Sequence, residues 1–174
     1  MTPNEPTVLV DSELLAIYLN DHWAGAAAGG ALARRLWRQN ASSDWGDRLR
    51  RLAEEIKEDD QTLARLRSHF SVDGGRAKRV FARASEIGSR LKPNGRMFGY
   101  SPLSRLLEAE AMLSGVAGKQ RLWSACRHGL PPGSAPAFDF ETLERRAGQQ
   151  LELLREFHHH AAGLAFNNRA GARA

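Results

Sequence analysis

Apolar residues recur at three- and four-residue spacing over four long segments of the chain, the periodicity of amphipathic α-helices. The spacing predicts helices over Ser12–Gln39, 44–70, 102–128 and 140–166. The second segment has the clearest row, in which seven of eight positions are apolar and Asp59 is the exception. Such a row is typical of the packed face of a helix bundle, so we expect an all-α protein.

Residues with special backbone preferences mark where these helices begin and end. Asp11 or Ser12, Ser101 followed by Pro102, and Asp139 are N-cap signals for three of the helices. Residues 73–75 read Asp-Gly-Gly and end the second helix, and a shorter amphipathic helix is predicted over 76–91 before the Pro-Asn-Gly turn at 93–95. Four long helices and one short helix are therefore expected.

The lengths of the connections predict how the helices assemble. At 1.5 Å per residue each long helix is about 40 Å long. Short loops join the first helix to the second and the third to the fourth, whereas about 30 residues connect the two pairs, enough to climb the bundle. We expect a ferritin-like antiparallel four-helix bundle with one long crossover that contains the short helix. An up-down bundle capped by that helix is the alternative. Residues 11–166 form the single domain, with flexible ends at 1–10 and 167–174.

Three short stretches resemble an uncharacterised bacterial ferritin-like family. They are Tyr-Leu-Asn-Asp-His at 18–22, Leu-Lys-Pro-Asn-Gly-Arg at 91–96 and Ser-Pro-Leu-Ser-Arg-Leu at 101–106. The resemblance covers most of residues 11–166. It implies the fold, and it brings no activity with it.

The chain lacks the ligand pattern of a ferritin-type di-metal centre, which needs inward-facing Glu and Glu-x-x-His motifs. The second helix has Glu55 and Glu58 but no histidine in that register, and Glu156 and His159 are turned away from the apolar row by Phe157. We therefore predict no di-iron centre, no metal and no other cofactor, and no catalytic residues.

Polar residues on the apolar rows are the first candidate site. His22, Asp59 and Gln150 each interrupt a row, and their heights along the helices agree to within one turn. This predicts a buried polar layer with His22 and Asp59 in contact, Glu55 nearby and Glu110 about two turns away. The layer is either a satisfied hydrogen-bond network that fixes helix register or a ligand or metal site.

Two glycines share a row with His22. Gly25 and Gly29 lower helix stability, so they must be tolerated for close helix approach or for space beside the polar layer. We expect close approach.

The second candidate site is a basic segment. Residues 75–105 hold eight basic residues and one acid, a net charge of +7 in a chain of net charge +5. The residues that could bind an anion or a nucleic acid there are Arg76, Lys78, Arg79, Arg83, Arg90, Lys92 and Arg96. A solvated charged face that pairs with acids of the second helix is the alternative.

Composition adds a setting. No apolar run reaches the roughly 18 residues of a membrane span, residues 1–7 do not resemble a signal peptide, and the single cysteine, Cys126, makes no disulfide framework within the chain. We predict a cytoplasmic protein, and the preference for Arg over Lys suggests a bacterial source. The four tryptophans, Trp23, Trp37, Trp45 and Trp123, leave a homodimer open as an alternative to packing in the core.

The sequence leaves three functions open. The first is a non-catalytic binding or structural bundle. The second is a metal-dependent or redox protein with a buried His and carboxylate site. The third is a nucleic-acid or acidic-partner binder that uses the basic segment.

Overall fold

The computed structural model describes residues 10–72 and 100–167, and all regular secondary structure in these ranges is helical. The helices are α1 (Ser12–Gln39), α2 (Gly46–His69), α4 (Pro102–Gly129) and α5 (Phe140–Phe166). The sequence-predicted all-α class and four long helices agree with this structure. The short helix predicted over 76–91 and the basic segment 76–96 lie outside the described residues.

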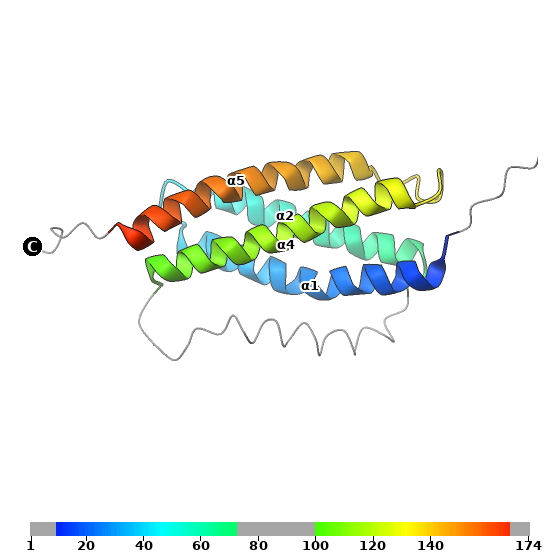
Figure 1. Cartoon of the computed structure of the whole chain (residues 1–174), viewed down its shortest axis with the longest axis horizontal. Helices are drawn as coiled ribbons and strands as arrows, with labels where there is room; N and C mark the ends of the chain where they lie inside the picture. Colours follow the sequence, from blue (N-terminus) through cyan, green and yellow to red (C-terminus); the bar gives the residue numbers. More distant parts are fainter. Residues whose placement is uncertain (1–9, 73–99, 168–174) are drawn as a thin grey trace, which may run out of the picture.

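The four helices lie side by side as a bundle (Figure 1). Along the chain, α1 and α5 run toward one end of the bundle, and α2 and α4 run toward the other. α4 packs along α5, α1 packs along α2, and a shorter contact joins α1 to α4, whereas α2 and α5 touch at few points. The bundle is therefore two tightly packed helix pairs with looser seams between the pairs.

Side-chain caps hold three of the four helix starts. Asp11 accepts from the backbone N–H of Glu13 and of Leu14, Ser101 accepts from Ser104 N–H, and Asp139 accepts from Thr142 N–H. Each satisfies donors that the first helical turn leaves unpaired. The turn into α2 uses another device, because Trp45 gives no side-chain cap and the chain instead doubles back closely. A Cβ on Gly46 would lie 2.3 Å from Ala41 O.

The core agrees with the predicted rows of α2 and α5. Leu49, Leu52, Ile56, Leu63 and Leu66 of α2 are buried. So are most members of the α5 row: Leu143, Ala147, Gln150, Leu154, Phe157 and Ala161. Cys126 is also buried, and burial raises the pKa of its thiol to about 12, which leaves it a small core side chain.

The predicted row of α1 is offset from the buried one. Of the predicted row, Leu36 is buried, Gly25 is exposed, and the other members are partly buried: Leu15, Tyr18, His22, Gly29 and Leu32. Leu19 and Ala33, each one position beyond a member of that row, are buried. The middle of this helix, residues 24–31, consists of alanine and glycine, so its hydrophobic periodicity is weak and two neighbouring rows compete. The predicted row lies beside the core, where it borders a groove.

Polar contacts join α1 to its two neighbours. Arg67 of α2 donates from Nε and Nη2 to Asn20 Oδ1 at 3.2 and 2.7 Å, and its guanidinium lies 4.1 Å from the Trp23 ring centroid. Arg35 Nε lies 2.7 Å from Glu108 Oε1 on α4. These contacts fix the height of α1 against α2 and α4. None of the described helices has the length and apolar character needed to cross a membrane.

Candidate functional site

Asp59 is the centre of a polar cluster inside the bundle. Its side chain is 1% exposed, and Lys119 of α4 donates from Nζ to Asp59 Oδ2 at 2.5 Å. Arg146 of α5 donates from Nη2 to Asp59 Oδ1. A buried carboxylate is costly unless it is paired and hydrogen-bonded, and here cations from two other helices meet it. Asp59 therefore ties α2 to both α4 and α5.

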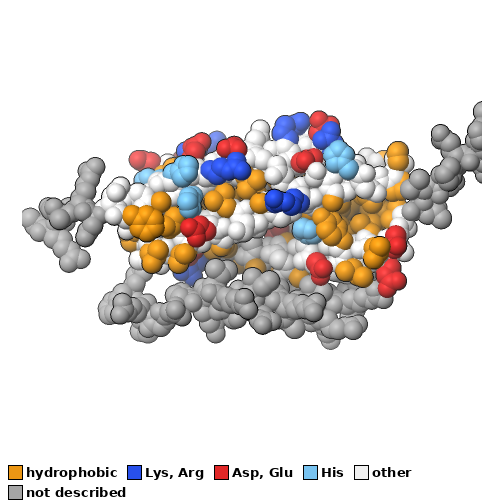
Figure 2. All heavy atoms as spheres, in the orientation of Figure 1, with side chains coloured by type: hydrophobic (Ala, Val, Ile, Leu, Met, Phe, Trp, Pro, Cys, Tyr) orange, Lys and Arg blue, Asp and Glu red, His pale blue; other side chains and the backbone are white. Residues whose placement is uncertain are grey.

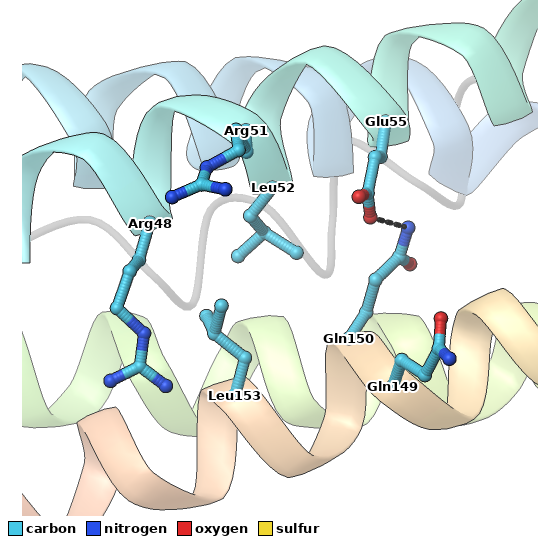
Figure 3. A pocket seen from close by; sticks show the side chains of 7 residues that line it. All are labelled: Arg48, Arg51, Leu52, Glu55, Gln149, Gln150 and Leu153. Carbon is cyan, nitrogen blue, oxygen red and sulfur yellow. Dashed lines mark hydrogen bonds between the residues drawn. The ribbon is translucent and has the colours of Figure 1, made fainter.

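Gln150 extends this cluster across the bundle (Figure 3). Its amide Nε2 donates to Glu55 Oε2 at 3.0 Å and to Asp59 Oδ2 at 3.3 Å. Its Oε1 accepts from Lys119 Nζ at 2.6 Å. The amide thus uses both of its ends, as a buried amide must to avoid an unpaired polar atom. Glu55 and Gln150 also line a small pocket of about 240 Å³ between α2 and α5.

Each of the two cations in the cluster, Arg146 and Lys119, lies beside an acid of α2. Arg146 also donates from Nη1 to Glu58 Oε2 at 3.0 Å, so one guanidinium joins two acids of α2. Burial lowers the pKa of Lys119, and the nearby Asp59 carboxylate opposes that shift. The pairing with Asp59 is what keeps a buried ammonium group at this position.

Three of the predicted layer residues meet here, and two do not. Asp59, Gln150 and Glu55 belong to the cluster. His22 forms no hydrogen bond with Asp59 within the described residues, although both line the same cavity; the His22 ring packs edge-on against Tyr18, with centroids 4.7 Å apart. Burial lowers the pKa of His22. His22 lies outside the cluster because it belongs to the offset row of α1.

Glu110 lies outside the cluster. Its side chain is 51% exposed and is 3.4 Å from His158 Nε2 at the surface. The prediction that placed it near the layer chose the wrong row of α4. The buried row of that helix includes Ala109, Met112, Val116 and Trp123.

Lys119 and Arg146 were missed by the sequence-based reasoning. Lys119 continues the buried row of α4 at the same spacing as its apolar members, so it is the polar interruption of that helix. The signal was therefore present, but two competing rows hid it. Arg146 lies one position before the buried Ala147, and nothing in the periodicity distinguishes it from a surface arginine.

A groove of about 360 Å³ lies beside the cluster, between α1, α2 and α4. Its apolar lining comes from Leu32, Ile56, Leu63, Met112, Val116, Leu122 and Trp123, and small residues of α1 complete it. Its polar lining consists of Asp21, His22, Asp59, Asp60 and Lys119. In Figure 2 the surface is recessed between α4 and α1. The cavity lies in the size range of small-molecule sites, which are mostly apolar with a few polar groups.

Glycines leave this groove open. Among the described residues, a Cβ on Gly25, Gly29 or Gly115 would meet no atom within 4 Å. The expectation of close helix approach at Gly25 and Gly29 is therefore wrong for the described helices. The other interpretation, space beside the polar layer, matches the structure.

Asp60 also lines the groove, but unlike Asp59 it is not held by cations of the neighbouring helices. A Cβ on Gly30 would lie 2.9 Å from Asp60 Oδ2, so the carboxylate sits directly against the α1 backbone. Burial raises the pKa of Asp60 to about 6, and the nearby Lys119 opposes the shift. Within the described residues Asp60 forms no hydrogen bond or ion pair. The groove thus contains an acid whose charge has no direct partner.

The described residues offer no metal site. Within 10–72 and 100–167, no group of three or more His, Cys, Asp and Glu side chains is placed to hold a metal ion. Glu156 is bound to Arg48 at 2.6 Å and His159 is exposed, so that pair faces away from the core as expected. The anion-binding residues predicted between 76 and 96 lie outside the described residues.

Comparisons of the chain with protein-family models, with curated proteins and with solved structures found no match. The resemblance to a bacterial ferritin-like family therefore stays a prediction.

Proposed function

We propose that this chain is a ferritin-like four-helix bundle that acts as a non-catalytic binding protein, with the groove between α1, α2 and α4 as its ligand site. The helix directions in Figure 1 support the bundle topology, because the second and third long helices run the same way, as one long crossover requires. We keep the cytoplasmic location as part of the proposal.

The observation that carries the binding function is the groove itself. It holds about 360 Å³ beside a core of buried apolar side chains, and it is larger than the pocket of about 240 Å³ between α2 and α5. Glycine lowers helix stability by about 1 kcal/mol relative to alanine, and three glycines line this groove with space around them. These glycines bring no benefit to a purely structural bundle, whereas in a binding protein they leave room for a ligand.

The polar cluster has a supporting role in this proposal. Asp59 and Gln150 link its side chains from three helices, and Arg146 Nε is the buried cluster atom without a hydrogen-bond partner among the described residues. We assign it the task of fixing the heights of α2, α4 and α5, which keeps the groove walls in place. The metal-dependent alternative loses support because, among the described residues, no group of three or more His, Cys, Asp and Glu side chains is placed to hold a metal ion.

Filling the groove tests the proposal. Gly115→Leu adds a side chain inside it, and Gly118→Leu adds the same side chain on the same helix at a position that does not line it. Binding of a neutral apolar probe such as n-octanol, followed by calorimetry, should be lost in the first variant and kept in the second. Equal binding by both variants, or no binding by the unmodified protein, would contradict the proposal.

A further inference from the structure

The two neighbouring aspartates of α2 differ in what surrounds them. Asp59 accepts from Lys119, Arg146 and Gln150, so its charge is compensated within the protein. Asp60 lines the same groove, is partly buried, and forms no hydrogen bond or ion pair within the described residues. A partly buried carboxylate beside an apolar surface is costly unless a donor reaches it. Neither Asp60 oxygen is a fully buried atom, so solvent reaches the carboxylate, but no described side chain pairs with its charge.

The two cations nearest to Asp60 do not pair with it. Arg34 of α1 and Lys119 of α4 are near enough to act on its pKa, but neither makes an ion pair with it. Lys119 is also engaged, because it donates to Asp59 at 2.5 Å and to Gln150 at 2.6 Å. Asp59 adds a like charge from the same helix. The negative charge of Asp60 therefore favours a further positive group in the groove.

The charged lining of the groove is negative in balance. Three aspartates line it, Asp21, Asp59 and Asp60, against a single cation, Lys119. His22 is the remaining titratable lining residue, and burial favours its neutral form. An anionic ligand would meet net repulsion here, and a cation would not.

The apolar part of the lining indicates the polarity and the size of the ligand. Ile56, Leu63, Met112, Val116 and Leu122 present apolar surface to the groove. An engineered apolar cavity of about 150 Å³ holds one benzene molecule, so a groove of about 360 Å³ holds roughly twice that bulk. An apolar body of up to about twelve carbon atoms, twice the six of benzene, fits this volume.

We propose that the groove binds an organic cation, an amine with an apolar body, whose ammonium group lies against the Asp60 carboxylate. This rests on the proposed binding function and names its ligand class. Asp60 is the specificity residue, and the apolar walls supply the bulk of the affinity. Gly30 leaves the space in which the carboxylate lies.

Three probes of equal chain length test the ligand class: n-octylamine, n-octanol and n-octanoate, measured by calorimetry at pH 7.5. The unmodified protein should bind the amine about tenfold more tightly than the alcohol, the scale of one charge-assisted hydrogen bond, and should bind octanoate least. Asp60→Asn should bring amine and alcohol to equal affinity. Asp47→Asn makes the same chemical change at an exposed position of α2 and should leave the preference unchanged.

The outcomes separate the two proposals. If octanol binds and octylamine has no advantage, or octanoate binds best, the cation proposal is overturned while the groove remains a binding site. If none of the three binds, the binding function itself fails. Circular dichroism checks that Asp60→Asn is folded. If this variant does not fold, the order of the three affinities in the unmodified protein tests the cation proposal.

Discussion

At the scale of single residues, the molecule places an acid, Asp59, where three helices (α2, α4 and α5) would otherwise meet through apolar side chains. Periodicity alone predicted that Asp59 and Gln150 face inward, because each interrupts an otherwise apolar row. It could not predict their partners, since a contact between helices depends on the rotation of each helix. The pairing of Asp59 with Lys119 rather than His22 is the result of that rotation.

Replacing Asp59 by asparagine should destabilise the protein strongly. The change keeps the shape and removes the charge, which leaves the buried Lys119 and the nearby Arg146 without their common counterion. Breaking a buried pair in this way costs about 3–5 kcal/mol. Urea unfolding followed by circular dichroism measures the free energy of unfolding. Glu54→Gln, on the exposed face of the same helix, is the control, with an expected loss below about 1 kcal/mol. Equal losses in the two variants would show that Asp59 is not the centre of the cluster.

Asp60 should make stability depend on pH. Its pKa is raised from 3.8 to about 6 in the folded protein. The folded state therefore keeps a proton that the unfolded state has lost between these values, so the contribution is fully present below about pH 4 and is lost as the pH rises through 6. Asp60→Asn removes this dependence, and its stability relative to the unmodified protein should rise from pH 4 to pH 7. Urea unfolding at both pH values measures it; a constant or falling difference would contradict the assignment.

At the scale of elements, α1 shows where sequence patterns stop being informative. The rows of α2 and α5 were predictable because large apolar residues stand against charged ones, and the start of α5 was predictable from its N-cap, Asp139. In α1 the residues from 24 to 31 are all alanine or glycine, so no row stands out and the predicted face was offset from the buried one. The glycines of that row border the groove, which only the assembled helices reveal.

Glycine substitutions should distinguish open positions from closed ones. Gly25→Ala should raise the free energy of unfolding by about 1 kcal/mol, because the added Cβ meets no described atom within 4 Å and alanine favours the helix. Gly46→Ala should lower it, because its Cβ would lie 2.3 Å from the backbone oxygen of Ala41. Thermal unfolding of the two variants gives both values. A loss of stability in Gly25→Ala would show that this helix face is closely packed.

At the scale of the whole molecule, helix number and order followed from hydrophobic spacing and loop length. The groove did not, because it is made by residues that no local pattern links: glycines of α1, aliphatic side chains of α2 and α4, and a charged pair between them. Its charge followed no rule in the sequence either. The chain as a whole has a net charge of +5, whereas three aspartates and one lysine line the groove.

The most direct test of the ligand site is a ¹H–¹⁵N correlation spectrum of the tryptophan indole groups during titration with n-octylamine. Trp123 lines the groove, and its buried indole N–H has no hydrogen-bond partner among the described residues. Trp45 packs against Phe157 elsewhere in the bundle, with ring centroids 5.2 Å apart, and serves as the internal control. The account predicts a saturable shift of the Trp123 signal while the Trp45 signal stays in place. A shift of Trp45 without Trp123, or no shift of either signal, would contradict it.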